Sequence, residues 1–85
     1  MEKQEIYQQI TGTLEELGLG ATGITPEASL LRDLGLDSLD LAEFIMMMEM
    51  KFDISLPFAL IEQEGARIAD LVSIIQHQIN QHAAS

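Results

Sequence analysis

Residues 38–51 do most to constrain the fold of this 85-residue chain, because they combine a helix start with helical spacing of apolar residues. Asp37 and Ser38 stand at the start, where Asp and Ser side chains accept hydrogen bonds from unpaired backbone N–H groups. Four apolar residues then recur on one face of a helix, and we expect them to form its core side: Leu41, Ile45, Met48 and Phe52. The segment therefore predicts a helix that packs along one side.

Three other segments have helical spacing and stop near glycine or at the end of the chain: residues 3–17, 58–64 and 68–82. A long connection follows the first of them, opened by three glycines, Gly18, Gly20 and Gly23. We expect its leucines to anchor it to the core: Leu30, Leu31, Leu34 and Leu36. We expect residues 1–85 to form one all-α domain, a small helical bundle with three principal helices and one short helix.

The acidic composition limits the classes of partner. Fourteen acidic residues and four basic ones give a net charge of −10, which repels nucleic acid and anionic membranes and attracts basic partners. No apolar run approaches the roughly 18–20 residues that span a membrane, and residues 1–5 lack the basic and apolar regions of a secretory signal, so we expect a cytoplasmic protein without stable membrane insertion. We also expect a monomer. Because the chain has no cysteine, any thiol chemistry requires an added group.

Ser38 is the main candidate for chemistry. A serine hydroxyl needs a nearby base to act as a nucleophile, and the two histidines, His77 and His82, fall late in the last predicted helix. We therefore do not expect a hydrolase. An exposed serine at a helix start can instead accept a group from a modifying enzyme. The simpler alternative is that Asp37 and Ser38 only begin the helix.

The helix predicted over residues 38–51 has apolar residues on a second side. Three of them form a strip away from the core: Leu39, Met46 and Met50. Met47 and three acids, Asp37, Asp40 and Glu43, lie beside this strip. We interpret the strip and these neighbouring residues as an exposed surface that binds a partner. The alternative for each acid taken singly is that it lies on a solvated helix face without a partner. The acids lack the loop pattern of a calcium site, so we expect no bound metal.

Two stretches joined by an apolar run resemble the acyl carrier protein signature. They are Leu34-Gly35-Leu36-Asp37-Ser38-Leu39-Asp40 and Phe52-Asp53-Ile54-x-Leu56-Pro57. The resemblance implies that Ser38, next to Asp37, carries a covalent 4′-phosphopantetheine arm. It also implies a carrier that holds acyl groups as thioesters on this arm, and not an enzyme. The pathway would be fatty-acid, polyketide or related lipid synthesis.

The same resemblance implies partners with basic patches, namely a phosphopantetheinyl transferase and acyl-handling enzymes. They would contact Asp37, Asp40 and Glu43 together with Leu39 and Met46, and helical spacing adds Met47 and Met50 to this surface. Three residues are candidates to line an acyl pocket: Ile45, Met48 and Ile68. Ordinary core packing is the alternative for all three.

Two departures from the signature favour a specialised carrier over a bulk fatty-acid carrier. Met50 and Lys51, and the apolar residues 58–61, stand where bulk carriers are acidic. A competing function is an acidic, Met-rich helical adaptor that binds basic amphipathic helices without covalent modification. The two functions differ in one observable, the mass added at Ser38.

Overall fold

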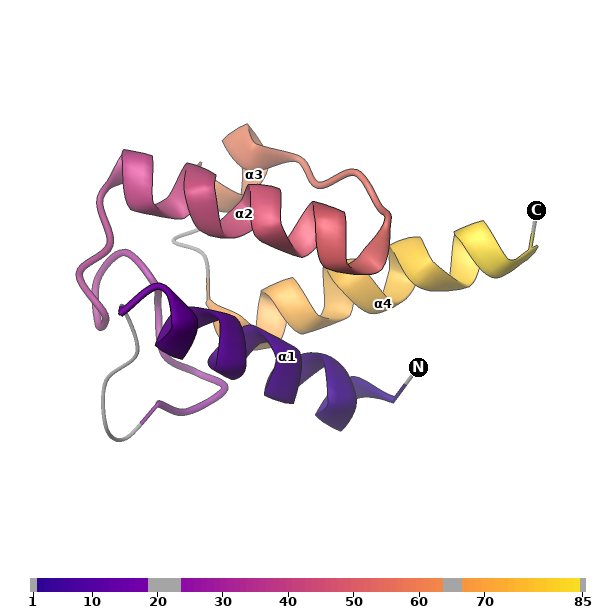
Figure 1. Ribbon diagram of the computed structural model, residues 1–85, viewed down its shortest axis with the longest axis horizontal. Coiled ribbons are helices and arrows are strands. Elements are labelled where there is room, and N and C mark those ends of the chain that lie inside the picture. The colour runs from indigo at the N-terminus through magenta and orange to yellow at the C-terminus, as the bar shows by residue number, and fades with distance from the viewer. Residues whose placement is uncertain (1, 19–23, 64–66, 85) are drawn as a thin grey trace.

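Four helices form the bundle in the computed structural model, which describes residues 2–18, 24–63 and 67–84. They are α1 (Lys3–Glu16), α2 (Ser38–Phe52), α3 (Phe58–Gln63) and α4 (Ile68–Ala84). α1 packs against α4 and α2, and the short α3 packs against α2 (Figure 1). The predicted all-α bundle with three principal helices and one short helix is confirmed. Gly20, Gly23 and the predicted helix end at Glu64 lie outside the described residues.

The buried face of α2 is broader than its predicted core side. Leu41, Ile45 and Met48 are buried as expected, but Phe44 is fully buried as well. Phe52, at the end of the helix, is only half-buried. Phe44 lies three residues after Leu41 and four before Met48, and α2 contacts both α1 and α3. The four-residue core side was therefore wrong in leaving out Phe44.

The end of α2 is fixed by hydrogen bonds that Glu49 accepts. Asp53 takes a left-handed conformation with φ 54°, and the N–H of Ile54 donates to the Glu49 carbonyl at 3.1 Å. The Glu49 carboxylate also accepts the N–H of Leu56 at 2.8 Å. Leu56 is buried, so this bond holds the extended segment before α3 against the core.

Leucines anchor the connection that leads into α2, as predicted. Leu30 and Leu36 are buried, and the half-buried Leu31 and Leu34 pack against the core. The N–H of Leu36 donates to the Leu30 carbonyl at 2.9 Å, which closes a turn. Gly35 lies in this turn with φ +72°, a conformation that glycine adopts without steric cost. The approach to Ser38 is thus held by packing and a backbone bond.

The connection is also paired with the start of α4. Ser29 and Arg67 form an isolated antiparallel β-bridge. The N–H of Ile68 donates to Ala28 at 3.0 Å, and that of Ala69 donates to Pro26 at 2.7 Å. The first N–H groups of a helix have no partner inside it, so the connection supplies these acceptors. None of the helices, over the residues described, is long and apolar enough to cross a membrane.

Candidate functional site

Ser38 is the first residue of α2, and its position is fixed by a capping box. The Asp37 carboxylate accepts the N–H of Asp40 at 2.8 Å, and the Asp40 carboxylate accepts the N–H of Asp37 at 3.5 Å. Asp37 is extended, with φ −88° and ψ −179°, as is usual for the residue before a helix. Ser38 is exposed. The predicted helix start is confirmed, and it presents the hydroxyl at the surface.

The Ser38 hydroxyl has a partner on another helix. Its Oγ donates to Glu62 Oε2 at 3.0 Å, across 24 residues of sequence. Glu62 lies on α3 and is half-buried. Nothing in the spacing of residues predicts this contact, because only the packing of α3 against α2 creates it. The hydroxyl therefore donates to a carboxylate that tertiary structure supplies.

The side of α2 opposite the core carries the predicted apolar strip. Leu39, Met46 and Met50 are 76%, 59% and 77% exposed, so their predicted exposure is confirmed. Met47 is half-buried, and its predicted exposure is wrong. Met47 follows Phe44 by three residues, and so it lies beside the edge of the buried face.

The acids beside the strip differ in exposure. Asp37 and Glu43 are exposed, whereas Asp40 is half-buried. Asp37 and Asp40 are both engaged in the capping box, so each has a structural role whatever else it contacts. Glu43 is exposed and takes no part in the capping box. It is therefore the best single probe of this surface.

The three candidate pocket residues lie in the same hydrophobic core. Ile45, Met48 and Ile68 are 3%, 0% and 0% exposed. Their burial fits either core packing or the lining of a pocket that opens for an acyl chain. Their role as a lining stays a prediction.

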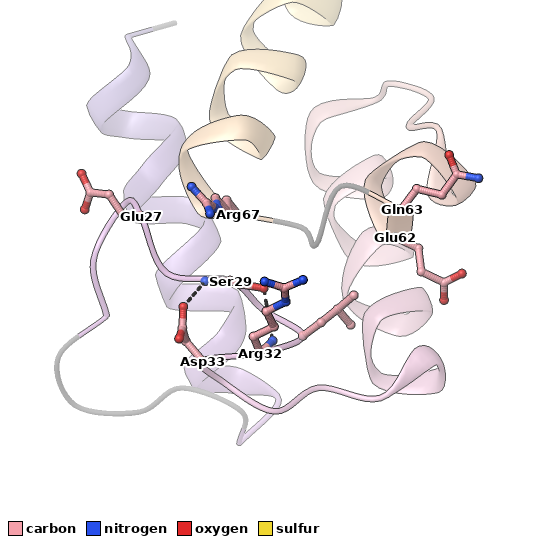
Figure 2. A pocket seen from close by; sticks show the side chains of 8 residues that line it. Glu27, Ser29, Arg32, Asp33, Glu62, Gln63 and Arg67 are labelled. Atoms are coloured by element: carbon pink, nitrogen blue, oxygen red, sulfur yellow. Dashed lines mark hydrogen bonds between the residues drawn. The ribbon is translucent and has the colours of Figure 1, made fainter.

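A polar cavity of about 490 Å³ lies between the connection and α3 (Figure 2). Its lining is Glu27, Ser29, Leu31, Arg32, Asp33, Glu62, Gln63 and Arg67. Asp33 accepts the N–H of Ser29 at 2.7 Å, and Ser29 Oγ accepts the N–H of Arg32 at 3.1 Å. Figure 2 shows the Glu62 side chain directed away from Arg32 and Arg67. The sequence pattern does not predict this cavity, because its walls come from segments far apart in the chain.

Comparison with known families assigns the class of this protein. Residues 9–75 match the family described as "Phosphopantetheine attachment site", which makes the chain a phosphopantetheine-binding carrier. It is 36% identical over 73 residues to an acyl carrier protein of Helicobacter pylori, covering 85% of this chain and 88% of that protein. It is 37% identical over 79 residues to an acyl carrier protein of Cyanidioschyzon merolae, covering 92% and 87%.

The chain belongs to the acyl carrier protein family. Its cofactor is therefore a covalently attached 4′-phosphopantetheine. Proteins of this family carry enzyme-bound intermediates and do not catalyse reactions themselves, so this chain is a carrier and not an enzyme. Membership of this family implies interaction with a phosphopantetheinyl transferase and with acyl-handling enzymes.

Proposed function

We propose that Ser38 is the attachment site of the arm and that the carrier delivers acyl thioesters to enzymes of a fatty-acid, polyketide or related lipid pathway. The observation that carries this proposal is the exposed Ser38 hydroxyl directly after the capping residue Asp37. A phosphodiester at Ser38 would lie at the first turn of α2, where helix N–H groups favour negative charge. The arm supplies the thiol that this cysteine-free chain lacks.

The docking surface follows from the exposed side of α2. Leu39, Met46 and Met50 offer apolar contact close to Ser38, and Met47 lies at the edge of that strip. Asp37, Asp40 and Glu43 offer negative charge to basic patches on the transferase and on acyl-handling enzymes. Apolar contact supplies affinity and charge supplies orientation, so the strip and the acids form one docking surface.

The cargo would lie in the core, between α2 and the start of α4. Ile45, Met48 and Ile68 are the residues proposed to line its path, and methionine adapts to a guest more readily than a branched side chain. Met50, Lys51 and the half-buried Phe58 favour enzymes of a dedicated pathway, because they replace acidic positions of bulk fatty-acid carriers. The cytoplasm as the place of action stays a prediction.

Attachment at Ser38 is tested with a broad-specificity phosphopantetheinyl transferase and coenzyme A. Intact-mass analysis of the wild type should show one added arm. Ser38→Ala should abolish the gain while keeping its helical circular-dichroism signal, and the matched control Ser55→Ala, at another exposed serine, should gain the arm normally. Labelling that persists in Ser38→Ala would overturn the assignment. No gain in the wild type would favour the unmodified adaptor.

The cargo and pathway need a second experiment. The carrier purified from its native host under conditions that preserve thioesters should release an acyl group on treatment with hydroxylamine. Mass spectrometry of the released acyl group then identifies the chain length and functional groups of the cargo. A protein that bears the arm but never an acyl group under any growth condition would contradict the carrier function.

A further inference from the structure

The hydrogen bond between Ser38 and Glu62 connects the proposed attachment atom to a carboxylate. The Ser38 Oγ donates to Glu62 Oε2 at 3.0 Å. The acids nearest to Ser38 in sequence, Asp37 and Asp40, are directed instead to backbone N–H groups in the capping box. Glu62 is thus the residue whose carboxylate accepts the hydrogen bond of the Ser38 hydroxyl.

The position of Glu62 is set by packing on α3. Its neighbour Ile61 is buried at 2% exposure and holds the helix against the core. The N–H of Ile61 donates to the Pro57 carbonyl at 3.0 Å at the start of this helix. The Glu62 side chain, half-buried, points away from Arg32 and Arg67 across the cavity (Figure 2). Its carboxylate therefore faces Ser38 and not the nearby cations.

We propose that Glu62 is a positioning residue for the attachment of the arm to Ser38, an inference that rests on the attachment site proposed above. In that reaction Ser38 Oγ forms a bond to the β-phosphorus of coenzyme A. The bond from this phosphorus to the oxygen of the departing adenosine 3′,5′-bisphosphate breaks, with its electron pair left on that oxygen, and the hydroxyl proton passes to water or to a base of the transferase. Glu62 orients the hydroxyl, so that one lone pair of Oγ is directed away from α3 toward the incoming phosphorus.

The contribution of Glu62 should be larger in the transition state than in the resting protein. A serine hydroxyl rotates freely in water, and the bond to Glu62 selects one direction of its proton. As the bond to phosphorus forms, Oγ gains positive character and its proton becomes more acidic. A carboxylate acceptor is then favoured more strongly than before, and only such differential interactions raise the rate of the chemical step.

Kinetics of attachment to Glu62 variants test this role. With the transferase at a catalytic concentration and coenzyme A at saturation, initial rates of mass gain are measured against carrier concentration for the wild type, Glu62→Gln and Glu62→Ala. Glu62→Ala should lower kcat about threefold to tenfold, as the loss of one hydrogen bond to a charged acceptor implies. Its KM for the carrier should stay within twofold of wild type.

Glu62→Gln and Glu27→Gln are the informative controls. Glu62→Gln keeps a side-chain oxygen that can accept from Ser38, so it should retain more of kcat than Glu62→Ala. Glu27→Gln removes the same charge from the same cavity, at an exposed residue on the connection, and should behave like the wild type. Circular dichroism and urea unfolding show that each variant is folded. Because Glu62→Gln is nearly isosteric, it remains measurable even where Glu62→Ala unfolds.

Three outcomes would overturn the inference, and one would overturn the function beneath it. A wild-type kcat in Glu62→Ala would show that the bond does not matter for attachment. Equal losses in Glu62→Gln and Glu62→Ala would show that the charge, and not the acceptor, matters. An effect confined to KM and removed by salt would make Glu62 a docking acid. Arm attachment to Ser38→Ala would instead remove the proposed site itself.

Discussion

Asp37 and Asp40 accept hydrogen bonds from each other's backbone N–H groups at the start of α2. Two of the acids predicted to meet a basic partner therefore also fix the first turn of the helix that carries Ser38. A substitution at either position changes docking and helix stability together. Glu43, which is exposed and outside the capping box, separates the two effects.

Removal of the cap should destabilise the fold. Asp37→Ala leaves the N–H of Asp40 without its side-chain acceptor, and loss of such a cap costs about 0.5–2 kcal/mol. Urea unfolding followed by circular dichroism measures the change. Glu43→Ala, on the same helix, should stay within about 0.5 kcal/mol of wild type. Equal stability of Asp37→Ala and wild type would show that the capping box adds nothing measurable.

Docking to a basic transferase should depend on Glu43 and on salt. Glu43→Lys should slow association more than it speeds dissociation, because charge near the site steers encounter. Surface plasmon resonance at low and high salt measures both rates. Glu15→Lys, an equal charge change on the exposed side of α1, is the matched control and should have a smaller effect. Affinity that is the same at all salt concentrations would exclude the acidic surface as the docking site.

The effect of replacing a methionine of α2 on the free energy of unfolding should depend on how deeply that methionine is buried. Met50→Gln changes a side chain that is 77% exposed and should shift the free energy of unfolding by no more than about 0.5 kcal/mol. Met48→Ala removes a fully buried side chain and should cost about 2–5 kcal/mol. Met47→Gln should fall between them, because Met47 is half-buried. A loss above about 2 kcal/mol for Met50→Gln would place this surface in the core.

Counterions should stabilise the fold. A net charge of −10 on 85 residues opposes compaction, and added salt screens this repulsion. Lys51 and Glu16 form an ion pair at 3.7 Å between α2 and α1, but the Glu16 side chain is 61% exposed, so the pair contributes little to stability and its screening by salt costs little. The melting temperature should rise with sodium chloride and with millimolar magnesium. A melting temperature that falls with salt would show that attractive pairs dominate.

The helices were predictable from the sequence because each has apolar residues at helical spacing and residues near its ends that begin or stop a helix. The start of α2 at Ser38 follows from the polar pair Asp37 and Ser38 ahead of the apolar spacing, and the exposed strip of Leu39, Met46 and Met50 follows from helical geometry. Phe44 also had the right spacing, three residues from Leu41, and a wider core face would have included it. Its burial, and the half-burial of Met47 beside it, depend on how much of α2 its neighbours cover.

Tertiary contacts of the site were beyond prediction for a different reason. Glu62 reaches Ser38 only because α3 packs against α2, and helical spacing within one segment carries no information about such a contact. The cavity with Arg32 and Arg67 likewise joins the connection to the end of α3 and the start of α4. These features depend on the relative placement of segments, which a single sequence does not encode in any local pattern.

The pairing of the connection with the start of α4 has a consequence for biosynthesis. Ala28 and Pro26 accept hydrogen bonds from the N–H groups of Ile68 and Ala69, so the stretch that leads to Ser38 obtains these partners from α4. A chain still on the ribosome lacks these donors until α4 has been synthesised. We therefore expect nascent chains that lack α4 to be poor substrates for the transferase, so that the arm is added only after α4 has paired with the connection.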